Sequence, residues 1–143
     1  MARSRYLTPE SIIRAVKAGD FYASSGVVLN EVAVADGELR LEIAAEKGVS
    51  YTTQFIGTPV DYDKTTQPRK DKAGAATTQK YSSDVGKVFA TVKGSSARYK
   101  LTGKELYVRA VVTSDKPHRD PSFAKQTEQA WTQPIGWEGR LRR

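Results

Sequence analysis

Apolar residues near the start of the chain recur at spacings of three and four: Ile12, Ile13 and Val16. This spacing places them on one face of an α-helix. Thr8 is a preferred N-cap residue, and Pro9 suits the first helical position. Gly19 readily adopts the left-handed conformation in which many helices end. The pattern predicts a helix over about residues 8–18, whose apolar stripe must be buried on the rest of the chain or on another domain.

Beyond residue 20 the period changes to two, which is typical of half-buried strands. Three apolar residues alternate with charged ones after the hairpin signal Asp36-Gly37: Leu39, Leu41 and Ile43. The most apolar strand is predicted at Leu106–Val112. Further strands are predicted over residues 29–34, 50–56, 87–93, 97–101 and 130–135. The last of these is expected at a sheet edge, because Pro134 cannot donate to a ladder.

Short strands separated by turns predict an antiparallel β-sandwich. The fold class expected is mainly β, an Ig-like sandwich with one N-terminal α-helix, and residues 1–143 are expected to form a single domain. Two polar stretches interrupt the strand pattern. Residues 58–84 carry little apolar content and predict a long loop, and residues 113–128 predict a second one.

The net charge of +7 and the pI of about 9.7 favour acidic partners only in a general way. The cations are scattered over both termini and the middle of the chain: Arg3, Arg5, Arg69, Lys70, Lys72, Arg140, Arg142 and Arg143. Solvated termini and a solvated loop explain this scatter better than a nucleic-acid surface does, so nucleic acid is not expected as a partner.

No apolar run approaches the length of a membrane span, so no membrane partner is expected. No apolar segment follows Met1–Arg5, so no secretory signal peptide is expected. The chain contains no Cys, which excludes disulfides and thiolate metal ligands. These features are compatible with any cellular compartment.

Candidate catalytic residues are few. His118 is the only His, and a zinc site needs three or four converging ligands. Asp61 and Asp63 have the spacing of calcium ligands, but the Gly and the terminal Glu of a calcium loop are missing. Lys93–Ser96 lacks the glycines of a phosphate loop and is interpreted as a turn. No catalytic residue, metal site or cofactor site is therefore expected in this chain.

Aromatic side chains leave a second function open, because a row of exposed rings can stack on sugars or bases. The residues that could take part are Tyr51, Tyr99, Tyr107, Trp131 and Trp137. Packing in the core or at its rim is the simpler expectation for a small sandwich. Trp137 is the better candidate for exposure, because Gly136 and Gly139 flank it. The alternative function is a free-standing module that binds carbohydrate or a polyanion.

The phrase Gly-Asp-Phe-Tyr-Ala-Ser-Ser-Gly at residues 19–26, directly after the predicted helix, is the most distinctive in the chain. It resembles the segment that follows the metal-binding barrel in PHP-type (polymerase and histidinol phosphatase-like) hydrolases. Two phrases near the other end, Leu106–Ala110 and Ala130–Ile135, resemble the end of such proteins. Residues 58–84 have no counterpart in the resemblance.

The resemblance implies a C-terminal β-rich segment without its catalytic barrel. PHP-type enzymes bind two or three metals through His, Asp and Glu of the barrel and hydrolyse phosphoesters, and those motifs would lie upstream of Thr8. The expected function is a non-catalytic accessory domain whose partner is the catalytic domain of the same parent protein. A small hydrolase that uses its own carboxylates is a third, less favoured possibility. Four residues are candidates for contact with the partner domain or its substrate: Phe21, Tyr22, Ser24 and Ser25. For the two serines, a simple turn is the plainer interpretation.

Overall fold

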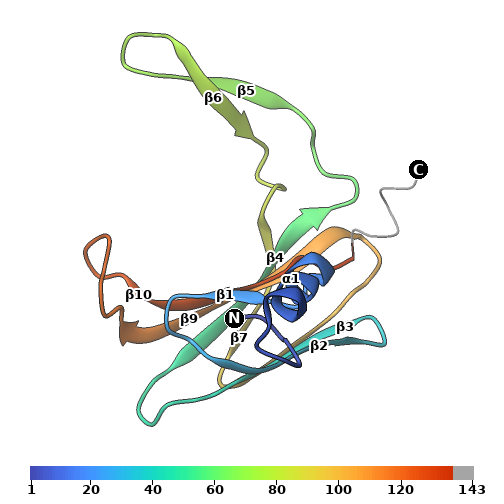
Figure 1. Cartoon of the computed structure of the whole chain (residues 1–143). Coiled ribbons are helices and arrows are strands. Elements are labelled where there is room, and N and C mark those ends of the chain that lie inside the picture. The colour runs from blue at the N-terminus through green and yellow to red at the C-terminus, as the bar shows by residue number, and fades with distance from the viewer. Residues whose placement is uncertain (137–143) are drawn as a thin grey trace.

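The computed structural model describes residues 1–136 and shows two antiparallel sheets facing each other, with a helix at one side and a hairpin that projects away (Figure 1). The elements are α1 (Pro9–Ala18), β1 (Tyr22–Ser24), β2 (Leu29–Ala35), β3 (Glu38–Ile43), β4 (Tyr51–Pro59), β5 (Thr66–Lys70), β6 (Ala76–Tyr81), β7 (Lys87–Lys93), β8 (Ser96–Lys100), β9 (Glu105–Pro117) and β10 (Thr127–Thr132). The predicted fold class, a mainly β antiparallel sandwich with one N-terminal helix, is confirmed. Trp137 and the cations beyond it lie outside the described residues.

The helix α1 forms where local signals place it. The hydroxyl of Thr8 accepts a hydrogen bond from the Ser11 N–H at 3.3 Å, which caps the first turn. Gly19 ends the helix with φ of 76°, a left-handed conformation that glycine adopts without steric cost. Ala15 is the buried residue of the helix. The predicted helix is confirmed, whereas its apolar stripe is not buried on the sandwich.

The larger sheet has five strands in the order β1-β10-β9-β4-β7, and the smaller has three in the order β2-β3-β8. The prediction that residues 130–135 form an edge strand is wrong, since β10 lies between β9 and the short strand β1. The ladder stops at Thr132, before Pro134, so the missing N–H of that proline breaks no strand pairing. The predicted loop 113–128 is shorter in the structure, because β9 continues to Pro117 and β10 begins at Thr127.

The core lies between the two sheets. Alternate residues of β3 and β9 point into it, as the sequence pattern predicts: Leu39, Leu41, Ile43, Val108, Ala110 and Val112 are all buried. Phe55 of β4, an interior strand of the larger sheet, is fully buried and stacks on Tyr99, with ring centroids 5.3 Å apart. The core therefore joins residues that are distant in sequence into one apolar cluster.

Strand β4 passes unusually close to β9 at Gly57. A Cβ atom at Gly57 would lie 1.9 Å from the carbonyl oxygen of Tyr107. Any side chain at Gly57 would therefore push apart two paired strands in the middle of the larger sheet. The glycine is needed here for space, not for its backbone freedom.

Residues 61–84 form an arm that projects from the end of β4 (Figure 1). The sequence predicts a loop here, and this prediction is wrong because β5 and β6 pair over five positions to form a two-stranded hairpin. Every residue of β5 and β6 is exposed. Since no residue of the hairpin faces a core, its strands carry no alternation of apolar and polar residues, which is the signal that sequence analysis relies on.

Candidate functional site

Residues 21–26 form a strand and a turn at one edge of the larger sheet. Strand β1 pairs with β10, so Tyr22, Ala23 and Ser24 lie opposite Thr132, Trp131 and Ala130. Ile135 bridges to Val108 of β9. The phrases that carry the resemblance, near the two ends of the chain, are therefore neighbours in one sheet.

The two serine hydroxyls of the phrase hold the turn. Ser24 Oγ donates to the Val27 carbonyl at 2.5 Å and accepts from the Gly26 N–H at 3.0 Å. Ser25 accepts from the Gln129 N–H at 2.9 Å, and its own N–H donates to the Gln129 carbonyl, also at 2.9 Å. These bonds fix the turn against β10. Both hydroxyls thus have structural partners, as the plainer interpretation of the phrase expects.

Gly26 completes the turn because a side chain would not fit. A Cβ atom here would lie 2.2 Å from Cδ of Glu128, whose side chain packs directly over the glycine. Glu128 is buried, and its carboxylate lies 3.5 Å from Lys116 Nζ. Lys116 Nζ also bonds Glu46 at 2.7 Å. The turn is therefore held from one side by a small charge cluster.

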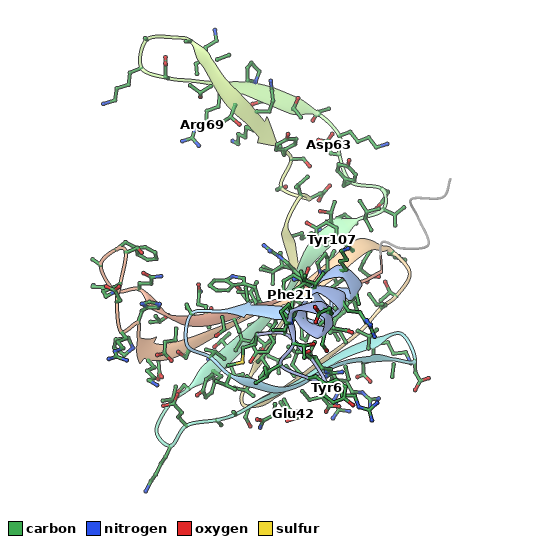
Figure 2. All side chains as sticks on the ribbon, in the orientation of Figure 1. Tyr6, Phe21, Glu42, Asp63, Arg69 and Tyr107 are labelled. Carbon is green, nitrogen blue, oxygen red and sulfur yellow. The ribbon has the colours of Figure 1, made fainter. Side chains whose placement is uncertain are left out.

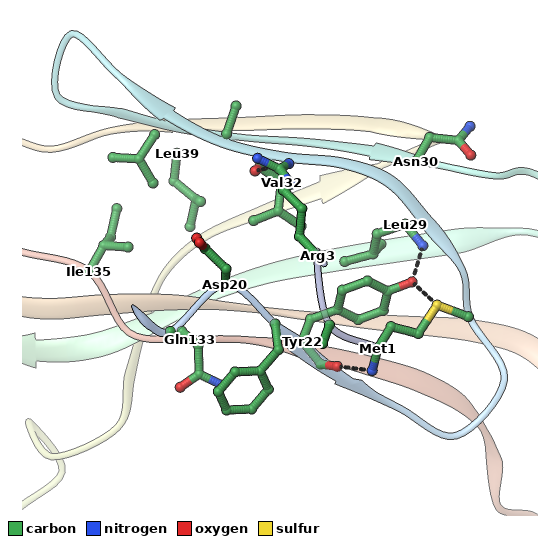
Figure 3. Close-up of a pocket in the computed structure, with 15 residues that line it drawn as sticks. Met1, Arg3, Asp20, Tyr22, Leu29, Asn30, Val32, Leu39, Gln133 and Ile135 are labelled. Atoms are coloured by element: carbon green, nitrogen blue, oxygen red, sulfur yellow. Dashed lines mark hydrogen bonds between the residues drawn. The ribbon is translucent and has the colours of Figure 1, made fainter. Parts of the chain in front are cut away.

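Phe21 and Tyr22 line a cavity of about 590 Å³ between the N-terminal segment, β1 and β2 (Figure 3). The Tyr22 hydroxyl accepts a hydrogen bond from the Leu29 N–H at 2.9 Å and donates to the Met1 sulfur at 3.0 Å. Arg3 donates to the Val32 carbonyl at 3.1 Å. Sequence reasoning did not find this cavity, because its walls come from segments that only tertiary packing brings together.

The cavity has apolar walls of Leu29, Val32 and Ile135 and a few polar side chains: Arg3, Asp20, Asn30 and Gln133. These groups can hold a ligand by charge and hydrogen bonds. Among the described residues that line the cavity, none is a Ser, Cys, His or Lys. The described part of its walls thus offers groups that can bind a polar ligand.

The titratable residues singled out in the sequence lie apart from this cavity. His118 is half-buried in the β9–β10 connection, where its Nδ1 accepts from the Asp120 N–H at 3.1 Å. Asp63 accepts from the backbone and the hydroxyl of Thr65, both at 2.8 Å, and these bonds lower the pKa of its carboxyl group. Within residues 1–136, no group of three or more His, Cys, Asp or Glu side chains could hold a metal ion.

Glu105 is a buried carboxylate that the sequence did not single out. It accepts hydrogen bonds from the Tyr99 hydroxyl at 2.8 Å and the Thr102 hydroxyl at 2.7 Å. Burial raises the pKa of Glu105, but the bonds from Thr102 and Tyr99 outweigh it and lower that pKa below 4.5. Burial and the bond to Glu105 raise the pKa of Tyr99 to about 12. Both carboxylate oxygens of Glu105 accept hydrogen bonds at the start of β9, so the cluster is a structural one.

The aromatic side chains do not form an exposed row in the described part of the chain. Tyr51 is buried, and its hydroxyl accepts from the Glu46 N–H at 3.1 Å. Tyr99 stacks between Phe55 and Phe89. Trp131 is half-buried within the larger sheet, between β1 and β9. Tyr107, labelled in Figure 2, is also half-buried.

The apolar stripe of α1 is the most unusual surface of the sandwich body. The exposed fractions of its side chains are 39% for Ile12, 54% for Ile13 and 48% for Val16. At about 100° per residue these three side chains cover one side of the helix, away from Ser11 and Ala15. Ser11 is covered by the N-terminal segment, since Ser4 Oγ lies 2.7 Å from Ser11 Oγ. Leu7, directly before the N-cap, is 95% exposed.

Comparison of the chain with family models, curated proteins and solved structures found no match. Among the described residues, no helix is long and apolar enough to cross a membrane.

Proposed function

We propose that this chain is a non-catalytic accessory β-sandwich domain of a larger PHP-like metal-dependent hydrolase. In this proposal the apolar surface of α1, formed by Leu7, Ile12, Ile13 and Val16, packs against the catalytic barrel of the same parent protein. The observation that carries the proposal is that these side chains stay exposed although the sandwich core lies nearby. An amphipathic helix that exposes its apolar side is typical of a site that binds another protein surface.

Energetics favour burial of this surface. Complete burial of one aliphatic side chain contributes about 1.5–3 kcal/mol, and the three stripe residues are roughly half exposed. Each would thus gain about 1 kcal/mol from a partner that covers it. The cations Arg14 and Lys17 flank the stripe and would lie at the polar rim of such an interface.

The parent family is inferred from the resemblance, and the arrangement of the strands supports that inference. The phrase that would follow the barrel, residues 19–26, begins where α1 ends and continues into β1. The closing phrase Ala130–Ile135 forms the second half of β10, the only strand with which β1 pairs among the described residues. The proposed docking helix is thus followed directly in the chain by the strand that carries the most distinctive phrase of the resemblance.

The test is association with the catalytic domain of the parent protein, produced separately. The variant Ile13→Glu/Val16→Glu places two charges on the apolar stripe. The matched control Arg14→Gln/Lys17→Gln changes the net charge by the same amount at the same spacing, but at the polar rim of the proposed interface. We expect the first variant to weaken association at least about 100-fold, since two buried charges each cost several kcal/mol. The control should weaken it less than about fivefold.

Two results would overturn the proposal. One is an equal loss of affinity for the catalytic domain in both variants, which would show that the stripe is not part of the interface. The other is a native polypeptide of the same size as this chain, with no hydrolase domain in the reading frame upstream of Met1.

A further inference from the structure

Positive charge is concentrated on the outer part of the projecting arm. Three carboxylates, Asp61, Asp63 and Asp84, lie at the base of the arm, so residues 61–84 as a whole carry a net charge of only +1. Between residues 64 and 80 there are five cations, Lys64, Arg69, Lys70, Lys72 and Lys80, and one carboxylate, Asp71, which leaves a net charge of +4. The whole chain carries +7. In the sequence these cations look like parts of a solvated loop, whereas the pairing of β5 with β6 places Arg69, Lys70 and Lys80 on one two-stranded ribbon. Arg69 is labelled on this ribbon in Figure 2.

The acidic residues of the arm are used to shape its turns. Asp71 accepts from the N–H groups of Ala73 and Ala75 at 2.9 and 3.0 Å, which holds the hairpin tip. Asp63 accepts from Thr65 at the base. In the part of the chain that the structure describes, none of the five cations lies within 4.0 Å of a carboxylate oxygen. The positive charge of the ribbon is therefore not neutralised from within.

The cations lie on both faces of the ribbon. Gln67 pairs with Lys80 and Arg69 pairs with Thr78, so Arg69 and Lys80 share one face. Lys70 follows Arg69 directly on β5, and the alternation of side chains along a strand places it on the opposite face, at the step where the register to β6 shifts by one residue. Lys72 lies at the tip, between the two strands. An anionic partner of this ribbon must therefore present charge to both of its faces.

That requirement selects among polyanions. A lipid surface or a single acidic polysaccharide chain meets one face of a ribbon. A protein partner would need apolar or aromatic anchors, and the strands of the arm supply only Tyr81, which is 60% exposed. The major groove of B-form DNA is about 12 Å wide, admits a two-stranded ribbon and has phosphates along both walls. Thr and Gln side chains on the ribbon add neutral hydrogen-bonding groups.

We propose that the β5–β6 arm binds double-stranded DNA by entering its major groove, with Arg69 and Lys80 toward one phosphate wall and Lys70 toward the other. The sequence alone did not lead us to expect nucleic acid as a partner, because the pairing of β5 with β6, which brings Arg69 and Lys80 to one face, cannot be seen in it. The role is independent of the accessory role proposed above, because α1 takes no part in it. The binding is expected to depend on charge far more than on base sequence.

The test compares the full chain with two variants that lose the same charge. Arg69→Gln/Lys70→Gln/Lys80→Gln removes three cations of the arm. Arg98→Gln/Lys100→Gln/Lys104→Gln removes one Arg and two Lys that are exposed on the sandwich body. Binding to a fluorescent duplex of mixed sequence is measured by anisotropy at salt concentrations between about 50 and 200 mM. The slope of log K against log salt then reports how many phosphate contacts the protein makes. Thermal unfolding of all three proteins checks that the fold is unchanged.

We expect the wild-type chain to bind the duplex with a Kd of about 10⁻⁵ M near physiological salt. The arm variant should bind at least about tenfold more weakly, and its slope of log K against log salt should be shallower by about 3. The body variant should keep the wild-type slope within about 1. Bound protein should also protect guanine N7, which faces the major groove, from methylation.

Several results would overturn the proposal. The first is no binding to the duplex even at the lowest salt, and the second is an equal loss in both variants. The third is tighter binding to a sulfated polysaccharide or to anionic vesicles than to the duplex at equal charge concentration. Protection restricted to the minor groove would overturn the assignment of the groove.

Discussion

Strands β9 and β5 have the same backbone geometry and opposite surroundings. Strand β9 lies between β4 and β10, and it buries Val108, Ala110 and Val112 completely. Strand β5 pairs only with β6, and all its residues are exposed. Since a two-stranded hairpin alone adds little stability, the free energy of folding resides in the sandwich body. The arm and the apolar side of α1 are then surfaces whose side chains are available for binding.

This division predicts a large stability effect for core residues and almost none for peripheral ones. The largest effect is expected for Phe55→Ala, which removes a fully buried ring from between the sheets. We expect a loss of about 4 kcal/mol in the free energy of unfolding, measured with urea. The same substitution at Phe123, which is 65% exposed, should cost less than about 0.5 kcal/mol. Equal losses would contradict the division.

Gly57→Ala should cost about 3 kcal/mol, because the new Cβ would lie 1.9 Å from a carbonyl oxygen of β9. Gly48→Ala is the control, since no atom lies within 4 Å of its Cβ position and only its left-handed φ of 80° opposes alanine. We expect a loss of about 1 kcal/mol there. The free energy of unfolding of both variants is measured with urea. A smaller loss for Gly57→Ala than for Gly48→Ala would show that β4 does not pass so close to β9 at Gly57.

Glu105→Gln should cost about 2 kcal/mol at pH 7, since it weakens hydrogen bonds to a buried charge. The lowered pKa of Glu105 means that the folded state binds its proton less readily than the unfolded state does. The stability that ionised Glu105 contributes is therefore present above pH 4.5 and is lost as the pH falls through the folded pKa. Urea titrations from pH 7 to pH 3 should show the two proteins converging. A difference that stays constant with pH would contradict the account.

Two buried threonines differ in whether the side-chain hydroxyl forms a hydrogen bond. Thr132 accepts from the Ala110 N–H at 2.9 Å, so Thr132→Val should cost about 1.5 kcal/mol. The hydroxyl of Thr53 is buried and has no hydrogen-bond partner among residues 1–136. Thr53→Val should therefore leave the thermal midpoint unchanged or raise it slightly. A larger loss at Thr53 than at Thr132 would show that the hydroxyl of Thr53 is satisfied.

The smallest effect is expected at the periphery. Ile13→Glu/Val16→Glu in the isolated chain should change the free energy of unfolding by less than about 0.5 kcal/mol, because both side chains are already about half exposed. Circular dichroism during thermal unfolding is sufficient to measure this. A loss above about 2 kcal/mol would mean that the stripe is buried within the chain.

Local signals made α1 and β3 predictable. Thr8, Pro9 and Gly19 lie within one short segment and act through their own backbone neighbours. The arm was missed because its strands are defined by backbone hydrogen bonds to each other, with no buried side. The edge position of β1 was missed because three residues are too few to show a period. The cavity beside Tyr22 and the cluster around Glu105 depend on tertiary packing that no local pattern encodes.

The cations of the arm look scattered in the sequence but lie close together in the structure. Dispersed cations such as Arg69 and Lys80 are distant in sequence, and pairing of β5 with β6 brings them to one face. The same holds for the phrases of the resemblance, which meet only through pairing of β1 with β10.

Hydrogen exchange of the amides of α1 tests the central claim most directly, because a docked helix opens to solvent far less often than an exposed one. The measurement compares this chain alone with the intact polypeptide from its source, over residues 9–18, with the arm residues 66–81 as the internal reference. Covering of the apolar stripe by a catalytic barrel predicts exchange at least about 100-fold slower for α1 in the intact polypeptide, and unchanged exchange in the arm. Equal exchange of α1 in both samples, or an intact polypeptide no longer than this chain, would contradict the account.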